Sequence, residues 1–157
     1  MAPFAKHPAK VYPMERLEEV IKALENQATL FLFGGGTAEN HEIERLCATY
    51  KNVCPAHSQQ GLKGELALMG QLDVMLSMDS ANMHLASLVG TRVVSVWGGT
   101  HPFAGFMGWG QKAADCVQLD LPCRPCSVYG NKPCWRGDYA CMIGIKPEQI
   151  AEKLLSE

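Results

Sequence analysis

The fold is decided by a stretch that reads Val74-Met75-Leu76-Ser77-Met78-Asp79-Ser80-Ala81-Asn82-Met83-His84-Leu85-Ala86. Its apolar first part is typical of a buried strand, and its second part is typical of a helix that begins after Asp79 and Ser80. Such a helix presents unpaired backbone N–H groups and the positive end of its dipole to whatever binds above the sheet. The stretch therefore favours the binding of a phosphate group.

Strands and helices are expected to alternate on both sides of this stretch. Apolar runs predict strands over residues 2–5, 28–33, 52–54, 74–78, 93–97 and 117–121, and helical spacing predicts helices over 13–26, 38–50, 61–72, 82–89 and 147–156. In the helix over 61–72 we expect Leu62, Leu66 and Met69 to lie on one face. The alternation indicates an α/β fold, a Rossmann-like doubly wound parallel sheet built from right-handed βαβ units.

Three loops are expected to form one binding site. Ligands of doubly wound sheets bind beyond the carboxyl ends of the strands. The loops after Phe33, Met78 and Trp97 lie at such ends and are rich in Gly, Ser, Thr and Asp. We therefore expect the site at this edge of the sheet.

Composition indicates one soluble globular domain over residues 1–157. The chain is 47% hydrophobic and 19% charged, which argues against extended disorder. Its formal charge of −2 is nearly balanced, and no basic run marks a nucleic-acid surface. Nucleic acid is therefore not expected as a partner.

The seven cysteines are interpreted together with the expected location of the chain. No apolar run approaches a membrane span or a signal-peptide core, so we expect a cytoplasmic protein with thiols or metal ligands rather than disulfides. Cys47, Cys54 and Cys116 are expected to be small core residues. The other four fall in a loop rich in Pro and Gly, at about 122–143, and are either ligands of a structural zinc or reduced, loosely paired thiols: Cys123, Cys126, Cys134 and Cys141.

The stretch at 79–85 resembles the Asp-Ser/Thr-Gly-x-x-His-Leu pattern of glycosyltransferase family nine, the lipopolysaccharide heptosyltransferases. Further matches follow in order, at residues 2–7, 10–13, 32–36 with Glu39, and 97–102. These enzymes have a GT-B architecture, in which two Rossmann-like domains face each other across a cleft. Nearly the whole chain is similar to the C-terminal, donor-binding half alone, so we expect the N-terminal acceptor domain to be absent and the chain to be a fragment, a cut version of the protein or a naturally short one.

The resemblance implies a role for each matching residue. Lys10, assisted by Lys6, and the backbone amides around Ser80 and Ala81 are implied to contact the diphosphate. Glu39 is implied to contact the ribose, and Asp79 and His84 the sugar. The turn Gly98-Gly99-Thr100 is implied to offer a backbone cradle near the phosphates. Gln60 lies where the family's adenine neighbour is expected. Family members usually have Gly at the position of Ala81, so the backbone approaches the phosphate slightly less closely here.

Simpler interpretations of the same residues stay open. Asp79 or Ser80 can serve only as a helix cap, His84 can be a packed core residue, and Lys6 and Lys10 can be solvated. A glycine cluster at a strand end is explained equally well by any tight turn.

The function implied by the resemblance is the inverting transfer of heptose, or a related sugar, from a nucleotide carrier such as ADP to the lipopolysaccharide core of a bacterium. No cofactor is needed, because a lysine can offset the charge of the leaving diphosphate. The catalytic base of the family lies on the N-terminal domain, so we expect the isolated chain to bind donor without transferring sugar, with at most a peripheral association with the inner face of the inner membrane. Two rival hypotheses are a non-catalytic nucleotide-binding or interaction module from a split gene, and a zinc-dependent interaction domain.

Overall fold

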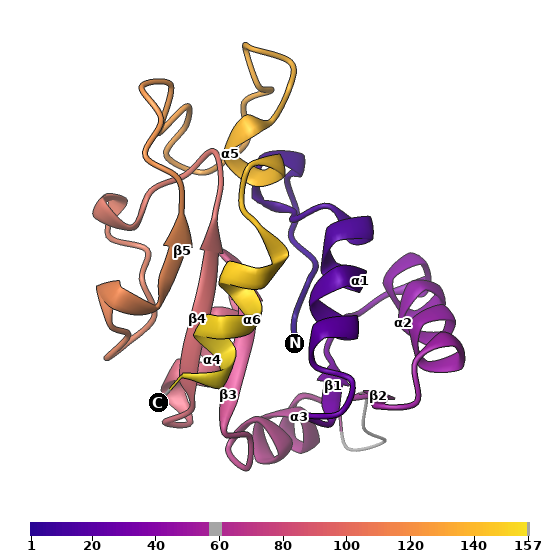
Figure 1. Ribbon diagram of the computed structural model, residues 1–157. Helices are drawn as coiled ribbons and strands as arrows, with labels where there is room; N and C mark the ends of the chain where they lie inside the picture. Colours follow the sequence, from indigo (N-terminus) through magenta and orange to yellow (C-terminus); the bar gives the residue numbers. More distant parts are fainter. Residues whose placement is uncertain (57–60, 157) are drawn as a thin grey trace.

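The computed structural model describes residues 1–56 and 61–156, and Figure 1 shows their arrangement. The helices are α1 (Met14–Ala23), α2 (Thr37–Thr49), α3 (Leu62–Met69), α4 (Ala81–Leu88), α5 (Ala140–Ile143) and α6 (Pro147–Leu155), with short 3-10 turns η1 (Pro8–Lys10), η2 (Pro102–Ala104) and η3 (Ala113–Asp115). The strands are β1 (Leu30–Leu32), β2 (Val53–Pro55), β3 (Val74–Met78), β4 (Arg92–Trp97) and β5 (Cys116–Gln118). In the described part of the chain, every helix is too short or too polar to cross a membrane.

The first two residues join two groups of parallel strands into one sheet. β1 pairs with β2, and β4 pairs with β3 and β5, always in parallel. Between β1 and β3, the Met1 amino group donates to the Phe31 carbonyl (2.5 Å), and Ala2 pairs in parallel with Ser77. The order across the sheet is therefore β2, β1, the Met1-Ala2 segment, β3, β4 and β5. The predicted first strand exists, but it is reduced to these two residues.

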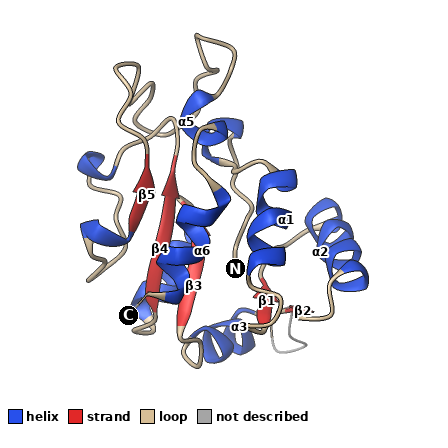
Figure 2. Cartoon of the chain, viewed as in Figure 1, coloured by secondary structure: helices blue, strands red, loops and turns tan. Residues whose placement is uncertain are grey.

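Helices cover both faces of the sheet, as the doubly wound prediction requires (Figure 2). On one face, α1, α2 and α6 bury apolar side chains that include Leu17, Ile43 and Ile150. On the other face, α3 and α4 bury Met69 and Met83, among others, against β3 and β4. Because β3 and β4 are covered on both sides, nearly all their residues are buried, which is why the apolar runs of the sequence located them well.

Several local predictions need correction. The face of α3 that carries Leu62, Leu66 and Met69 is buried only toward its C-terminal end, since Leu62 is 55% exposed, Leu66 is partly buried and Met69 is fully buried. Cys47, Cys54 and Cys116 are half-buried rather than fully enclosed. The strand predicted at 117–121 is shorter and begins one residue earlier, at Cys116. The loop expected at 122–143 contains the short helix α5.

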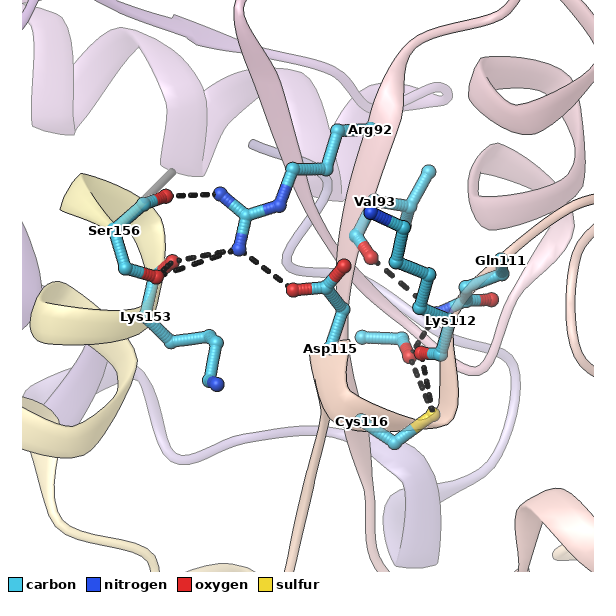
Figure 3. A network of polar contacts seen from close by, with 9 residues as sticks. Arg92, Val93, Gln111, Lys112, Asp115, Cys116, Lys153 and Ser156 are labelled. Atoms are coloured by element: carbon cyan, nitrogen blue, oxygen red, sulfur yellow. Dashed lines mark hydrogen bonds and ion pairs between the residues drawn. The ribbon is translucent and has the colours of Figure 1, made fainter.

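An ion pair at the amino end of β4 ties three elements together (Figure 3). Arg92, the first residue of β4, donates to the buried carboxylate of Asp115 in η3 (2.6 Å). The same guanidinium donates to the Lys153 carbonyl (3.1 Å) and to Ser156 at the end of α6. The planar guanidinium can reach several acceptors at once, so Arg92 fixes the C-terminal helix and η3 to the sheet.

Candidate functional site

A hollow of about 660 Å³ opens beyond the carboxyl ends of β1 and β3. It lies between the segment that follows the Met1-Ala2 strand, the glycine loop after β1 and the start of α4. Of the predicted site residues, six line it: Lys6, Lys10, Glu39, Asp79, Ser80 and Ala81. His84 lines a smaller adjoining hollow of about 210 Å³ that shares Lys10 and Asp79 with the larger one. The structure thus brings together loops that are far apart in the sequence.

An ion pair between Lys10 and Asp79 forms the centre of the site. Lys10 Nζ lies 2.9 Å from Asp79 Oδ2, and the hydroxyl of Thr100 donates to the same oxygen (2.8 Å). The Asp79 side chain is only 5% exposed, whereas that of Lys10 is 16% exposed. An ammonium group carries three donors, so one bond to Asp79 orients the Lys10 charge and leaves donors for a ligand in the hollow.

The turn at Gly98-Gly99-Thr100 positions Lys10 and is not itself a phosphate cradle. The Gly99 N–H donates to the Ala9 carbonyl in η1 (2.8 Å), and a Cβ on Gly98 would lie 2.4 Å from that same oxygen. Only glycine allows this close approach of two backbones. Thr100 is fully buried. The prediction of Thr100 as a donor-binding residue is corrected accordingly: it holds the carboxylate that holds Lys10.

The start of α4 faces the hollow with its amide groups uncapped. Ser80 is the N-cap residue, but its side chain makes no capping hydrogen bond; its hydroxyl lies 3.4 Å from that of Ser77. Ala81 and Asn82, the first residues of the helix, line the hollow. The first-turn N–H groups of a helix have no acceptor within it, and they carry the positive end of the dipole. The geometry thus favours an anion here over the simple interpretation of Ser80 as a cap.

Glu39 lies in the first turn of α2, at the far side of the hollow. Its Oε2 accepts the N–H of Gly35 (2.8 Å), which fixes the glycine loop after β1. Gly36, the N-cap of α2, has a φ of +85°, a conformation that favours glycine. The partly exposed carboxylate keeps its second oxygen for a ligand hydroxyl. Lys6 is exposed at the rim, and Gln60 lies outside the described residues.

The loop between β5 and α6 forms a wall of the site, which sequence reasoning missed. Arg124 donates to the Thr100 carbonyl (2.9 Å) and to that of Gly98, and the backbone N–H of Cys126 donates to the Gly99 carbonyl (2.9 Å). Gly130 packs against the stem of Lys10: a Cβ added there would lie 2.8 Å from Lys10 Cγ. The loop is polar and rich in Pro and Gly, so no periodicity in the sequence signals that it folds back over the sheet edge.

The four cysteines of this loop do not form a ready-made metal centre. Among residues 1–56 and 61–156, no three His, Cys, Asp or Glu side chains gather closely enough to hold one metal ion. The thiols also differ in their surroundings: burial raises the pKa of Cys126 and Cys141, whereas a backbone N–H at Tyr139 lowers the pKa of Cys134. A zinc held by these four thiols stays a prediction from the sequence alone.

Comparison with known proteins identifies the family. The profile of glycosyltransferase family 9 (heptosyltransferase) matches residues 1–134. The chain belongs to this family. It is 30% identical over 131 residues to lipooligosaccharide heptosyltransferase 2 of Campylobacter jejuni, an alignment that spans 79% of the chain but 39% of that protein. The family 9 chain described here therefore spans about two fifths of the length of its curated relative.

Solved structures confirm the fold of this family 9 chain. Escherichia coli ADP-heptose lipopolysaccharide heptosyltransferase II matches 98% of the chain and 44% of its own length, with a TM-score of 0.70 at 21% identity. Escherichia coli heptosyltransferase WaaC with ADP-2-deoxy-2-fluoro heptose matches 97% of the chain and 41% of its own length, with a TM-score of 0.68 at 18% identity. Both are heptosyltransferases, which are GT-B glycosyltransferases, so the GT-B assignment of the fold is confirmed.

Proposed function

We propose that this chain is the donor-binding part of a heptosyltransferase and that it binds a nucleoside diphosphate sugar, with ADP-heptose as the favoured donor. The observation that carries the proposal is the Lys10–Asp79 pair beside the uncapped start of α4, in a hollow of about 660 Å³. This volume suits a nucleotide-sized ligand. Membership of family 9 and the ADP named with a related solved structure support the choice of donor.

The diphosphate fits where the positive groups converge. In our proposal Lys10 and the first amides of α4 bind the phosphate oxygens, and Ser80 adds a hydroxyl donor. Glu39, across the hollow, accepts hydrogen bonds from the ribose. As the bond between sugar and diphosphate breaks, negative charge grows on the leaving group, and a preorganised ammonium and helix start stabilise that charge. Asp79 keeps Lys10 in place during this step.

Transfer also needs an acceptor and a catalytic base. We propose that the acceptor, the lipopolysaccharide core, and the catalytic base are brought by an N-terminal domain like that of the longer relatives, at the inner face of the membrane. The isolated chain is then expected to bind donor without turnover. Multiple turnovers by purified chain mixed with ADP-heptose and acceptor would contradict this expectation.

Titration calorimetry tests the binding site. We expect ADP to bind the chain and to bind a Ser80→Ala variant about threefold more weakly, because one hydroxyl donor is lost. An Asp79→Asn variant is expected to lose more affinity, since Lys10 is no longer held at the hollow. UDP and GDP serve as controls for the base. Failure of every nucleotide to bind, or equal affinity in all variants, would contradict the proposal.

A further inference from the structure

The smaller hollow beside His84 has an aromatic wall that none of the predicted site residues accounts for. This hollow of about 210 Å³ is lined by the apolar residues Phe106 and Val128, by Tyr129, and by polar groups that include Asp79 and His84. The rings of Phe106 and Tyr129 lie 5.7 Å apart and are tilted by 53°. Tyr129 also lines the larger hollow, so it lies where the two hollows meet.

Tyr129 is held at a fixed distance from Lys10 by its neighbours. The Gly130 N–H donates to Ser127 Oγ (3.0 Å), and the Ser127 hydroxyl donates to Asn131 Oδ1 (2.8 Å), which closes a tight turn around Tyr129. The Ser127 N–H donates to the Gly99 carbonyl (3.3 Å) on the sheet side. Gly130 packs on the Lys10 stem. The Tyr129 ring is nevertheless 62% exposed, so it is fixed through its backbone and free to contact a ligand.

This combination suits the sugar of the donor. A pyranose ring presents hydroxyls at its edge and, on one face, C–H bonds that carry partial positive charge, and the face of an aromatic ring is negative. The polar groups of the smaller hollow match the hydroxyls, and its aromatic rings match the C–H face. The smaller hollow has about a third of the volume of the larger one, about 210 Å³ against about 660 Å³, so it is the better match for the smaller part of a nucleotide sugar.

We propose that Tyr129, supported by Phe106, forms the sugar subsite and sets the preference of the chain for nucleotide sugars over free nucleotides. The inference rests on the proposed function, since it places the diphosphate at Lys10, between the nucleoside in the larger hollow and the sugar in the smaller one. The loop between β5 and α6, which carries Tyr129, then determines which ligands the site prefers.

Paired titrations with ADP and with ADP-heptose test this subsite. Tyr129→Ala is expected to weaken ADP-heptose binding five- to tenfold and ADP binding less than twofold. Tyr129→Phe keeps the ring and is expected to stay within twofold of the unmodified chain for both ligands. Trp135→Ala is the matched control, because Trp135 is an exposed aromatic residue of the same loop (76%) and lies outside the lining of both hollows.

The outcomes separate the subsite from the function on which it rests. If Tyr129→Ala weakens ADP and ADP-heptose equally, or neither, the subsite is wrong while the donor site stands. If the unmodified chain binds neither ligand, the proposed function and the subsite are both overturned. Saturation-transfer NMR on the unmodified chain gives a second measurement that needs no variant: irradiation of aromatic protons should transfer magnetisation to the sugar C–H protons, and its absence would overturn the subsite.

Discussion

The sheet carries a buried carboxylate paired with a cation at each of its two edges, one at the amino end of β4 and one at the carboxyl end of β3, and the two pairs differ in what surrounds the cation. At the amino end, the terminal nitrogens of Arg92 donate to Asp115, to the Lys153 carbonyl and to Ser156, all of them protein groups. At the carboxyl end, Lys10 donates to Asp79 and faces a hollow of about 660 Å³. A cation whose donors are used by the protein stabilises the fold, whereas one with donors left over can hold an anionic ligand.

A buried amino group between these two pairs gives the largest expected effect. Burial lowers the pKa of the Met1 amino group from 8.0 to about 5, and this group donates to the Phe31 carbonyl rather than to a carboxylate. Above pH 8 it is neutral in both the folded and the unfolded chain. Between pH 8 and pH 5 only the unfolded chain gains the proton, so the free energy of unfolding should fall as the pH falls, by at most about 4 kcal/mol.

Urea unfolding of the 157-residue chain across this pH range measures the effect. A chain acetylated at Met1 is the control, because it cannot take up the proton. A cavity of about 100 Å³ beside Met1 has room for the acetyl group. If the acetylated and free chains show the same pH dependence, burial of the Met1 amine is not its cause.

Arg92→Ala should lower stability without touching ligand affinity. The change leaves the Asp115 carboxylate, only 8% exposed, without its partner and frees the end of α6. Breaking a fully buried pair costs more, but the Arg92 side chain is 27% exposed, so we expect a loss of about 2 kcal/mol in the free energy of unfolding. Affinity for ADP should stay within twofold by calorimetry. A drop in affinity comparable to that of a Lys10 variant would break the division between the two ends.

Lys10→Met, in contrast to Arg92→Ala, should lower ligand affinity. Methionine keeps an apolar stem against Gly130 and removes the charge, and Asp79 retains the Thr100 hydroxyl as a partner, so the loss of stability should be about 2 kcal/mol, similar to that of Arg92→Ala. A charge-assisted hydrogen bond contributes about 1.5–3 kcal/mol, which corresponds to at least a tenfold loss of ADP affinity. Unchanged affinity in this variant would contradict the assignment of Lys10.

Ala81→Gly is expected to give the smallest effect. It tests whether the backbone at the start of α4 contacts the ligand. Ala81 is the first residue of α4 and lines both hollows. Removal of its Cβ lets a phosphate approach the backbone more closely, so we expect about a twofold gain in ADP affinity, at a cost of at most about 1 kcal/mol in stability. Weaker binding would show that the backbone here does not contact the ligand.

The sequence predicted best what depends on buried apolar runs. The strands at 74–78 and 93–97 were located to within a residue because both of their faces are covered. Sequence reasoning also brought Lys10, Glu39, Asp79 and Ser80 to one edge, because parallel strands end at the same side of a sheet. Their donor contacts remain a proposal.

Long-range backbone contacts could not be predicted in this way. The role of Thr100 depends on where its hydroxyl points in the buried interior, and that of Gly99 on a bond to Ala9, some ninety residues away. Tyr129 lies in a loop that is rich in Pro and Gly. Such a loop has no periodic pattern from which its packing against the sheet edge could be predicted.

The most direct test of the central claim is a crystal structure of the chain soaked with ADP. We expect the β-phosphate in the larger hollow, within hydrogen-bonding distance of Lys10 Nζ and of the first amides of α4, and the ribose near Glu39. ADP bound elsewhere, or bound with Lys10 still turned only to Asp79, would contradict it.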